Sequence, residues 1–238
     1  MKRILCLLAL PLFIMLSACD PKDISNLLDD LSGAALTDAD ISKALKEALQ
    51  LGVDNSVRQL SATDGFYSSS YKILLPDEAN VVIDKLKFIP GLATLEEEML
   101  RRINRAAEDA ATKAAPIFLD AVKSISFDDA MNILMGEKNA ATMYLNDKTY
   151  TRLYDSFKPV LVNSLNKFGA LDYWSDAVGK YNALPFVKEV NPDLADHINN
   201  KALYALFDLI EEKELGIRQD INQRTSELLR KVFARQDS

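Results

Sequence analysis

Three polar residues within one predicted helix could form a binding site. Asn104 and Arg105 lie four and three residues before Glu108, so the three side chains share one helix face. Such a cluster could bind a ligand or a partner protein. It could also be an internal clamp, in which Arg105 pairs with Glu108 and Asn104 caps a neighbouring loop. Because an unpaired buried polar group costs about 1–3 kcal/mol, a buried cluster should be fully hydrogen-bonded.

One histidine is available for acid–base or metal chemistry. His197 is the only histidine of the chain, and Asp193 and Asp196 precede it closely. These residues could orient a general base or bind a metal ion. However, the chain has no second histidine and no H-E-x-x-H pattern. We therefore interpret His197 as a capping or solvated residue early in a helix.

Other polar clusters do not predict catalysis either. Ser68-Ser69-Ser70 lacks the G-x-S-x-G context of a nucleophile, and we interpret it as a solvent-exposed loop. Glu211, Glu212 and Glu214 point around a helix rather than at one point, which favours a solvated face. We predict no catalytic residue, no metal site and no cofactor, and hence a protein that is not an enzyme.

Aromatic residues gather in the one segment that breaks the helical pattern. Phe66, Tyr67 and Tyr71 lie within residues 63–76, which contain the turn signal Asp64-Gly65 and end at a proline. An ordered loop of this kind is a plausible binding surface. The rings could equally fill a gap between two helical layers. The predicted binding residues are thus Phe66, Tyr67, Tyr71, Asn104, Arg105 and Glu108.

The amino terminus carries the pattern of an export signal. Lys2-Arg3 and a thirteen-residue apolar run precede Leu16-Ser17-Ala18-Cys19, and a cysteine at this point resembles a bacterial lipobox. The run is shorter than the roughly 20 residues that cross a hydrocarbon core. We predict a signal peptide at 1–18, a lipidated Cys19 and a tether over 19–37. An uncleaved anchor and an ordinary signal peptide are the alternatives.

The composition of the chain limits the kinds of partner that it can bind. The chain has a net charge of −7, and it becomes more acidic once the basic residues of the signal are removed, which argues against binding to nucleic acid. Cys6 and Cys19 are the only cysteines, so the folded part cannot form a disulfide. The lipid at Cys19 would hold the protein to a membrane on the periplasmic side. Asp20 resembles an inner-membrane retention signal.

Apolar residues recur every three or four positions along most of the chain, which predicts an all-α, multi-helix bundle over 38–238 with one irregular extended loop at about 63–76. Three capping patterns indicate helix starts at Thr37-x-x-Asp40, Thr94-x-x-Glu97 and Ser126-x-x-Asp129.

Other signals indicate where helices break or begin. Pro116 should break or kink a helix, and Gly136 should end one. Residues 139–148 and 153–165 are predicted as separate helices. Asn191-Pro192 should begin the last helical pair, whose second member starts near Ile217.

The run Asn104-Arg105-Ala106-Ala107-Glu108, followed by Pro116-Ile117-Phe118, resembles the uncharacterised bacterial family known as domain of unknown function 4197. The similarity covers about residues 40–234. It implies an exported or lipidated helical domain of Gram-negative bacteria with no assigned activity and no catalytic residues to transfer. Members usually carry Asn-Pro after Asp-Gly-Phe, whereas this chain has Tyr67-Ser68-Ser69-Ser70.

Two hypotheses for function follow. The first is a lipid-anchored, periplasmic, non-enzymatic domain that binds another envelope protein. The alternative is a helical module that holds a small apolar or amphipathic molecule between its helices near residues 63–76. A closed apolar pocket of roughly 300–1,000 Å³ would favour the alternative. The sequence leaves the oligomeric state open.

Overall fold

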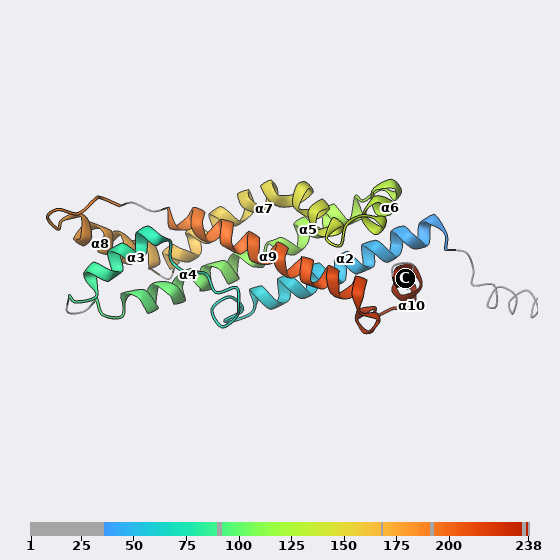
Figure 1. Cartoon of the computed structure of the whole chain (residues 1–238). Helices are drawn as coiled ribbons and strands as arrows, with labels where there is room; N and C mark the ends of the chain where they lie inside the picture. Colours follow the sequence, from blue (N-terminus) through green and yellow to red (C-terminus); the bar gives the residue numbers. More distant parts are fainter. Residues whose placement is uncertain (1–35, 90–91, 168, 191–192, 235–236, 238) are drawn as a thin grey trace, which may run out of the picture. The chain divides into compact units, whose positions relative to one another are not determined.

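The computed structural model describes residues 36–89, 92–167, 169–190, 193–234 and 237. The predicted signal peptide 1–18, Cys19 and nearly all of the tether 19–37 lie outside the described residues. Within them the α-helices, labelled in Figure 1, are α2 (Asp38–Ser61), α3 (Asp77–Leu86), α4 (Leu95–Ala111), α5 (Ala114–Lys123), α6 (Phe127–Met135), α7 (Ala140–Lys167), α8 (Ala170–Asn182), α9 (Leu194–Gln219) and α10 (Glu227–Phe233). A 3₁₀ turn, η1 (Ile221–Gln223), lies between α9 and α10. No strand occurs in the described part of the chain, and the all-α prediction is confirmed.

The long helices α2, α7 and α9 form the framework of the bundle. α9 packs against both α7 and α2, while α4 packs against α7 and α2 (Figure 1). On α4 the buried face is rich in alanine, which lets the neighbouring helices approach closely. The apolar stripe predicted from Ile41 to Leu60 is buried along α2.

Two of the three predicted capping patterns are confirmed. Thr37 with Asp40, and Ser126 with Asp129, each form a reciprocal capping box at the start of α2 and α6. The third pattern gives the correct helix start, since α4 begins at Leu95 directly after Thr94, but the capping bond itself is absent. Thr94 has φ −99° and ψ 7°, which is not the extended conformation of a capping residue, and its side chain makes no capping bond.

Several predicted boundaries are also wrong, because the apolar stripes continue through them. Residues 139–148 and 153–165 belong to one helix, α7, which contains Pro159. The break near Pro116 falls earlier, since α4 ends at Ala111 and Pro116 lies in the first turn of α5, where no N–H donor is needed.

The carboxyl-terminal boundaries need the same kind of correction. α9 begins at Leu194 with Asp193 as its capping residue, and Asn191-Pro192 lie outside the described residues. α9 then runs on to Gln219, so Ile217 belongs to α9 rather than to the last helix. Gly136 does end α6, as predicted. Among the described residues, no helix combines the length and the apolar character that crossing a membrane requires.

Candidate functional site

The irregular segment 62–76 links α2 to α3 (Figure 1). Hydrogen bonds fix it to side chains of α4 and α9. Its first part is a series of turns, in which Asp64 adopts a left-handed φ of 61°. Its second part, residues 72–76, is extended. Ile73 and Leu75 are buried, whereas Leu74 between them is 63% exposed. This alternation means that one side of the extended chain faces the bundle and the other faces solvent.

Asn104 holds the extended part of the loop from α4. Its Oδ1 accepts a hydrogen bond from the Ile73 N–H at 2.8 Å, and its Nδ2 donates to the Ile73 carbonyl at 2.9 Å. Nδ2 also donates to the Leu100 carbonyl at 2.7 Å. The amide thus pairs with both backbone groups of Ile73, as a neighbouring strand would. Asn104 is completely buried, so it belongs to the internal clamp and does not reach a surface.

Glu108, one turn further along α4, lies against the first part of the loop. Its Oε2 accepts a hydrogen bond from Arg105 at 2.6 Å, which is the pairing that the clamp interpretation expects. Burial raises the pKa of Glu108, although the charge of Arg105 and the nearby N–H groups of Asp64 and Phe66 oppose this. Its Oε1 is buried and has no hydrogen-bond partner of good geometry among the described residues.

Phe66 is fully buried and packs in the core. Of the two interpretations of the aromatic loop, its ring therefore fits the filling of a gap between helices. A partner that approached from outside could not touch it in this conformation. Tyr67 and Tyr71 are only partly buried, so the two tyrosines are the aromatic side chains of this loop that a partner can reach.

A pocket of about 170 Å³ lies where the loop meets α4. It is lined by Asp64, Tyr67, Arg101, Arg102, Arg105 and Glu108. The Tyr67 hydroxyl donates a hydrogen bond to Glu97, while Lys72 and Arg101 lie 3.9 and 4.9 Å from the centre of its ring. The pocket therefore gathers three of the predicted binding residues together with two further arginines.

The opposite edge of the loop faces α9. The Tyr71 hydroxyl donates to Asp208 at 3.0 Å, and burial together with this carboxylate raises the pKa of Tyr71. His197 Nε2 lies 2.9 Å from the Leu74 carbonyl, and because a carbonyl only accepts, Nε2 must carry the proton in this contact. His197 thus fastens the loop.

Two open grooves run along this edge of the loop. The first, of about 630 Å³, is lined by residues 70–78 and by side chains of α9 that include His197, Lys201 and Tyr204. The second, of about 680 Å³, continues past His197 and Lys201 toward Val81 on α3 and Val190. We refer to both together as the α9 groove.

The acidic residues beside His197 have structural partners. The Asp193 carboxylate accepts from the Asp196 N–H at 2.9 Å and caps α9. Asp196 in turn accepts from the Tyr154 hydroxyl and from Asn200. The described residues contain no cluster of three or more metal-binding side chains.

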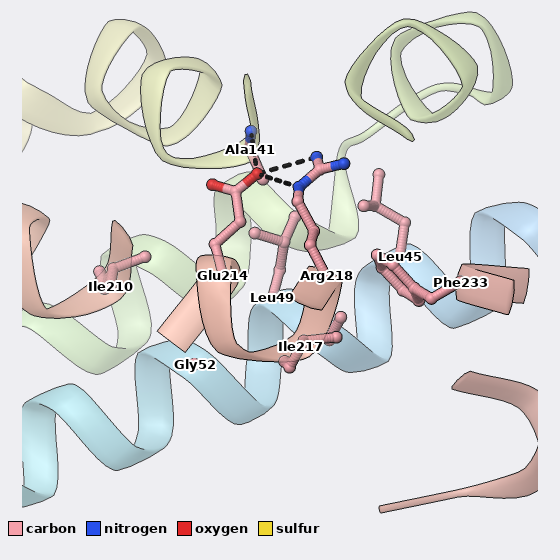
Figure 2. Close-up of a pocket in the computed structure, with 10 residues that line it drawn as sticks. Leu45, Leu49, Gly52, Ala141, Ile210, Glu214, Ile217, Arg218 and Phe233 are labelled. Carbon is pink, nitrogen blue, oxygen red and sulfur yellow. Dashed lines mark hydrogen bonds and ion pairs between the residues drawn. The ribbon is translucent and has the colours of Figure 1, made fainter. Parts of the chain in front are cut away.

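The sequence reasoning missed the buried pair Glu214 and Arg218, and the interpretation of Glu214 as solvated is wrong. Figure 2 shows Glu214 bound to Arg218 and to the Ala141 N–H. Its carboxylate accepts from the N–H groups of Ala141 and Thr142 at 3.0 and 2.8 Å, at the amino end of α7. Arg218 donates to the carbonyls of Ile133 and Leu134 at the carboxyl end of α6. The i, i+4 spacing of the two charges was the available signal.

A second buried arginine was also missed. Arg224 is completely buried and donates to the carbonyls of Ile217 and Arg218, at the carboxyl end of α9. Its Nη1 donates to the Asp237 carboxylate at 2.7 Å. No spacing rule identifies this residue, because its partners are mostly backbone carbonyls.

A small apolar cavity of the bundle lies beside Glu214 and Arg218. Its lining includes Leu45, Leu49, Ile210 and Phe233 (Figure 2). Its volume is only about 20 Å³. A cavity of this size holds about one water molecule. It is far smaller than the pockets that hold small-molecule ligands.

Comparison with known proteins identifies a family for this chain. The model of the family described as "Protein of unknown function (DUF4197)" matches residues 35–234. No curated protein and no solved structure matches the chain.

Proposed function

The chain belongs to the DUF4197 family of proteins of unknown function, and from this premise we propose that it is a lipid-anchored, periplasmic, non-enzymatic interaction module. In this proposal it binds an extended segment of another envelope protein along the α9 groove. The observation that carries the proposal is the exposed edge of residues 72–76.

The backbone of this segment supports pairing with a second extended chain. On the side of the loop that faces the bundle, the Asn104 side chain hydrogen-bonds both the N–H and the carbonyl of Ile73. In an extended chain the backbone groups of the next residue point the opposite way. There the Leu74 carbonyl accepts from His197, while the Leu74 N–H makes no hydrogen bond within the described part of the chain. An exposed N–H on an ordered extended edge is the feature that strand addition uses.

The surroundings of the edge also suit a polypeptide. The two parts of the α9 groove, of about 630 and 680 Å³, are lined by residues of the loop, α9 and α3. Leu74 and Tyr204, two of the most exposed apolar side chains described, line its first part. Exposed apolar residues beside polar groups are typical of surfaces that bind partners.

No observation favours the alternative function. The apolar cavity beside Glu214 is too small for an apolar ligand, and the larger spaces beside the loop are open grooves with mixed lining. We therefore retain the interaction module as the single proposal.

Attachment to the membrane is part of the same proposal. The lipobox-like sequence that ends at Cys19 supports acylation of this cysteine, and Asp20 supports the inner rather than the outer membrane. Several acyl chains on one residue would hold the protein permanently at the periplasmic surface.

Photo-crosslinking at single positions in intact cells tests the groove. A photoreactive amino acid is placed at Leu74 or Tyr204 in the groove, and at Met143 on α7 as the control. Met143 is similarly exposed, at 61% against 63% for Leu74 and 65% for Tyr204, and lies outside the groove. We expect one envelope protein to be crosslinked at both groove positions and not at Met143.

A second variant tests the backbone contact. Leu74→Pro removes the exposed N–H and should abolish the crosslink at Tyr204, whereas Leu74→Ala should keep it. Identical crosslinked proteins at all three positions, or none at the groove positions, would refute the proposal.

A further inference from the structure

The loop that follows α8 carries the most exposed apolar side chain of the described residues. Phe186 lies at the turn of this loop and is fully exposed, with a relative exposed area of 107%. Figure 1 shows the loop at the end of the bundle where α3 and α8 lie. We infer that Phe186 inserts into an apolar pocket of the partner protein whose extended segment occupies the α9 groove. The inference deepens the proposed function and rests on it for the identity of the partner.

One amide fixes the base of this loop. The Asn182 side chain, at the end of α8, donates from Nδ2 to the Val190 carbonyl at 3.2 Å, and its Oδ1 accepts from the Val190 N–H at 3.2 Å. The two ends of the loop, residues 183–189, are thereby joined. Because the backbone is already held in place, less conformational entropy is lost when a partner binds its side chains.

The backbone of Phe186 indicates a role outside the fold. Its φ is 64°, in the left-handed region that bulky residues rarely adopt. Pro185 followed by a residue with positive φ matches a type II turn, whose third residue is usually glycine or asparagine. Since the Phe186 ring is fully exposed, no packing within the described part of the chain compensates for this strain. Strained residues cluster where a side chain serves a binding site.

The loop adjoins the α9 groove. Lys188, Glu189 and Val190 line the second part of the groove, together with Val81 of α3, which is 46% exposed. Phe186 precedes the first of these loop residues by only two positions. A polypeptide that follows the groove to this end therefore reaches the loop, and Phe186 is the fully exposed apolar side chain beside its path.

The charge of the loop favours a protein rather than a lipid surface as the occupant. Segments that bind anionic lipid surfaces carry an excess of lysine and arginine besides their apolar residues. Here Lys188 is followed by Glu189, so the two charged side chains of the loop balance each other. Aromatic side chains, phenylalanine included, are enriched at protein interfaces.

Photo-crosslinking from Tyr204 in intact cells tests the inference in variants of Phe186. Phe186→Asn should lower the yield of the crosslinked partner at least about tenfold, because truncation of a central interface residue weakens binding by about this factor or more. Phe186→Tyr keeps the aromatic ring and should keep most of the yield. Met135→Asn is the matched control, since Met135 is an apolar residue that is 69% exposed and lies outside the groove.

The stability of the variant separates binding from a structural role. Asparagine adopts a positive φ more readily than phenylalanine, so the melting temperature of Phe186→Asn should equal or exceed that of the wild type. A structural role would instead predict a lower melting temperature together with the lost crosslink. A photoreactive amino acid placed at Phe186 itself should capture the same protein as one placed at Tyr204.

Four results would overturn the inference. They are an unchanged crosslink at Tyr204 in Phe186→Asn, an equal loss in Met135→Asn, a lower melting temperature of Phe186→Asn, and capture of lipid or of a different protein at Phe186. If Leu74 and Tyr204 still capture one protein in the wild-type background, only the role of Phe186 fails. Absence of those groove crosslinks in the wild-type background would refute the proposed function itself.

Discussion

At the scale of single residues, the loop depends on one amide. Asn104→Ala would leave the N–H and the carbonyl of Ile73 without partners in a buried position. Each lost partner costs about 1–3 kcal/mol, so we expect the free energy of unfolding to fall by about 3 kcal/mol. Urea denaturation measures this change.

Asn166→Ala is the control for this variant, because Asn166 lies on the exposed face of α7. It should change the free energy of unfolding by less than about 0.5 kcal/mol. If both variants cost the same, the loop is not held by Asn104.

Two glutamates on α4 should respond to pH in opposite ways. Burial raises the pKa of Glu108 above 4.5, so its ionisation disfavours the folded state as the pH rises through that raised value. The hydrogen bond from Tyr67 lowers the pKa of Glu97, so its ionised form favours the folded state, and this contribution is lost as the pH falls through the lowered value. As the pH rises from 3 to 7, the free energy of unfolding of Glu108→Gln should therefore increase relative to that of the wild type. Over the same range the free energy of unfolding of Glu97→Gln should decrease relative to that of the wild type.

Thermal denaturation at several pH values compares these two variants with the wild type. If the melting temperatures of Glu108→Gln and the wild type changed with pH in the same way, Glu108 would not be buried at the loop. A Tyr67→Phe background should remove most of the pH effect of Glu97→Gln, because it removes the hydrogen bond that causes it.

At the scale of helices, the pair of Glu214 and Arg218 joins three elements. Both charged side chains are about 6–7% exposed and lie on α9, between the amino end of α7 and the carboxyl end of α6. A carboxylate at a helix start and a guanidinium at a helix end also complement the two helix dipoles. Arg218→Met would leave a buried carboxylate without its cation, so we expect a loss of about 3–5 kcal/mol in the free energy of unfolding.

The neighbouring pair of Lys213 and Glu212, which is far less buried, provides the control. Lys213 and Glu212 lie 3.7 Å apart at the surface of α9, and Lys213→Met should change the free energy of unfolding by about 0–1 kcal/mol. Urea denaturation of both variants checks the difference. Similar values would mean that the buried network does not stabilise the junction of α6, α7 and α9.

Local signals predicted some elements and not others. The sequence predicted the capping boxes at Thr37 and Ser126 and the buried apolar stripe on α2, because each depends on residues three or four positions apart. The short helices α3 and α8 were not predicted. Each has few buried residues of its own, and each packs against the other, a contact that sequence spacing does not show.

The site was predicted in the same partial way. The spacing of Asn104, Arg105 and Glu108 indicated a shared face, and Arg105 does pair with Glu108. That Asn104 would bind Ile73, and that Arg101, Arg102 and Tyr67 would meet in one pocket, depends on the path of the loop. Contacts between residues distant in sequence are set by tertiary packing, which local patterns do not encode.

At the scale of the whole molecule, the proposed function depends on attachment of the chain to a membrane. If the sulfur of Cys19 carries the acyl chains, Cys19→Ser should reduce the share of the protein in the membrane fraction, because serine cannot carry the thioether-linked lipid that anchors it. Cys6→Ser is the matched control and should leave the protein in the membrane fraction, since Cys6 lies within the predicted signal peptide. Fractionation with mass spectrometry of the amino terminus measures both. Membrane association of Cys19→Ser equal to that of the wild type, or an unmodified Cys19 in the wild type, would show that the protein reaches its partner without a lipid.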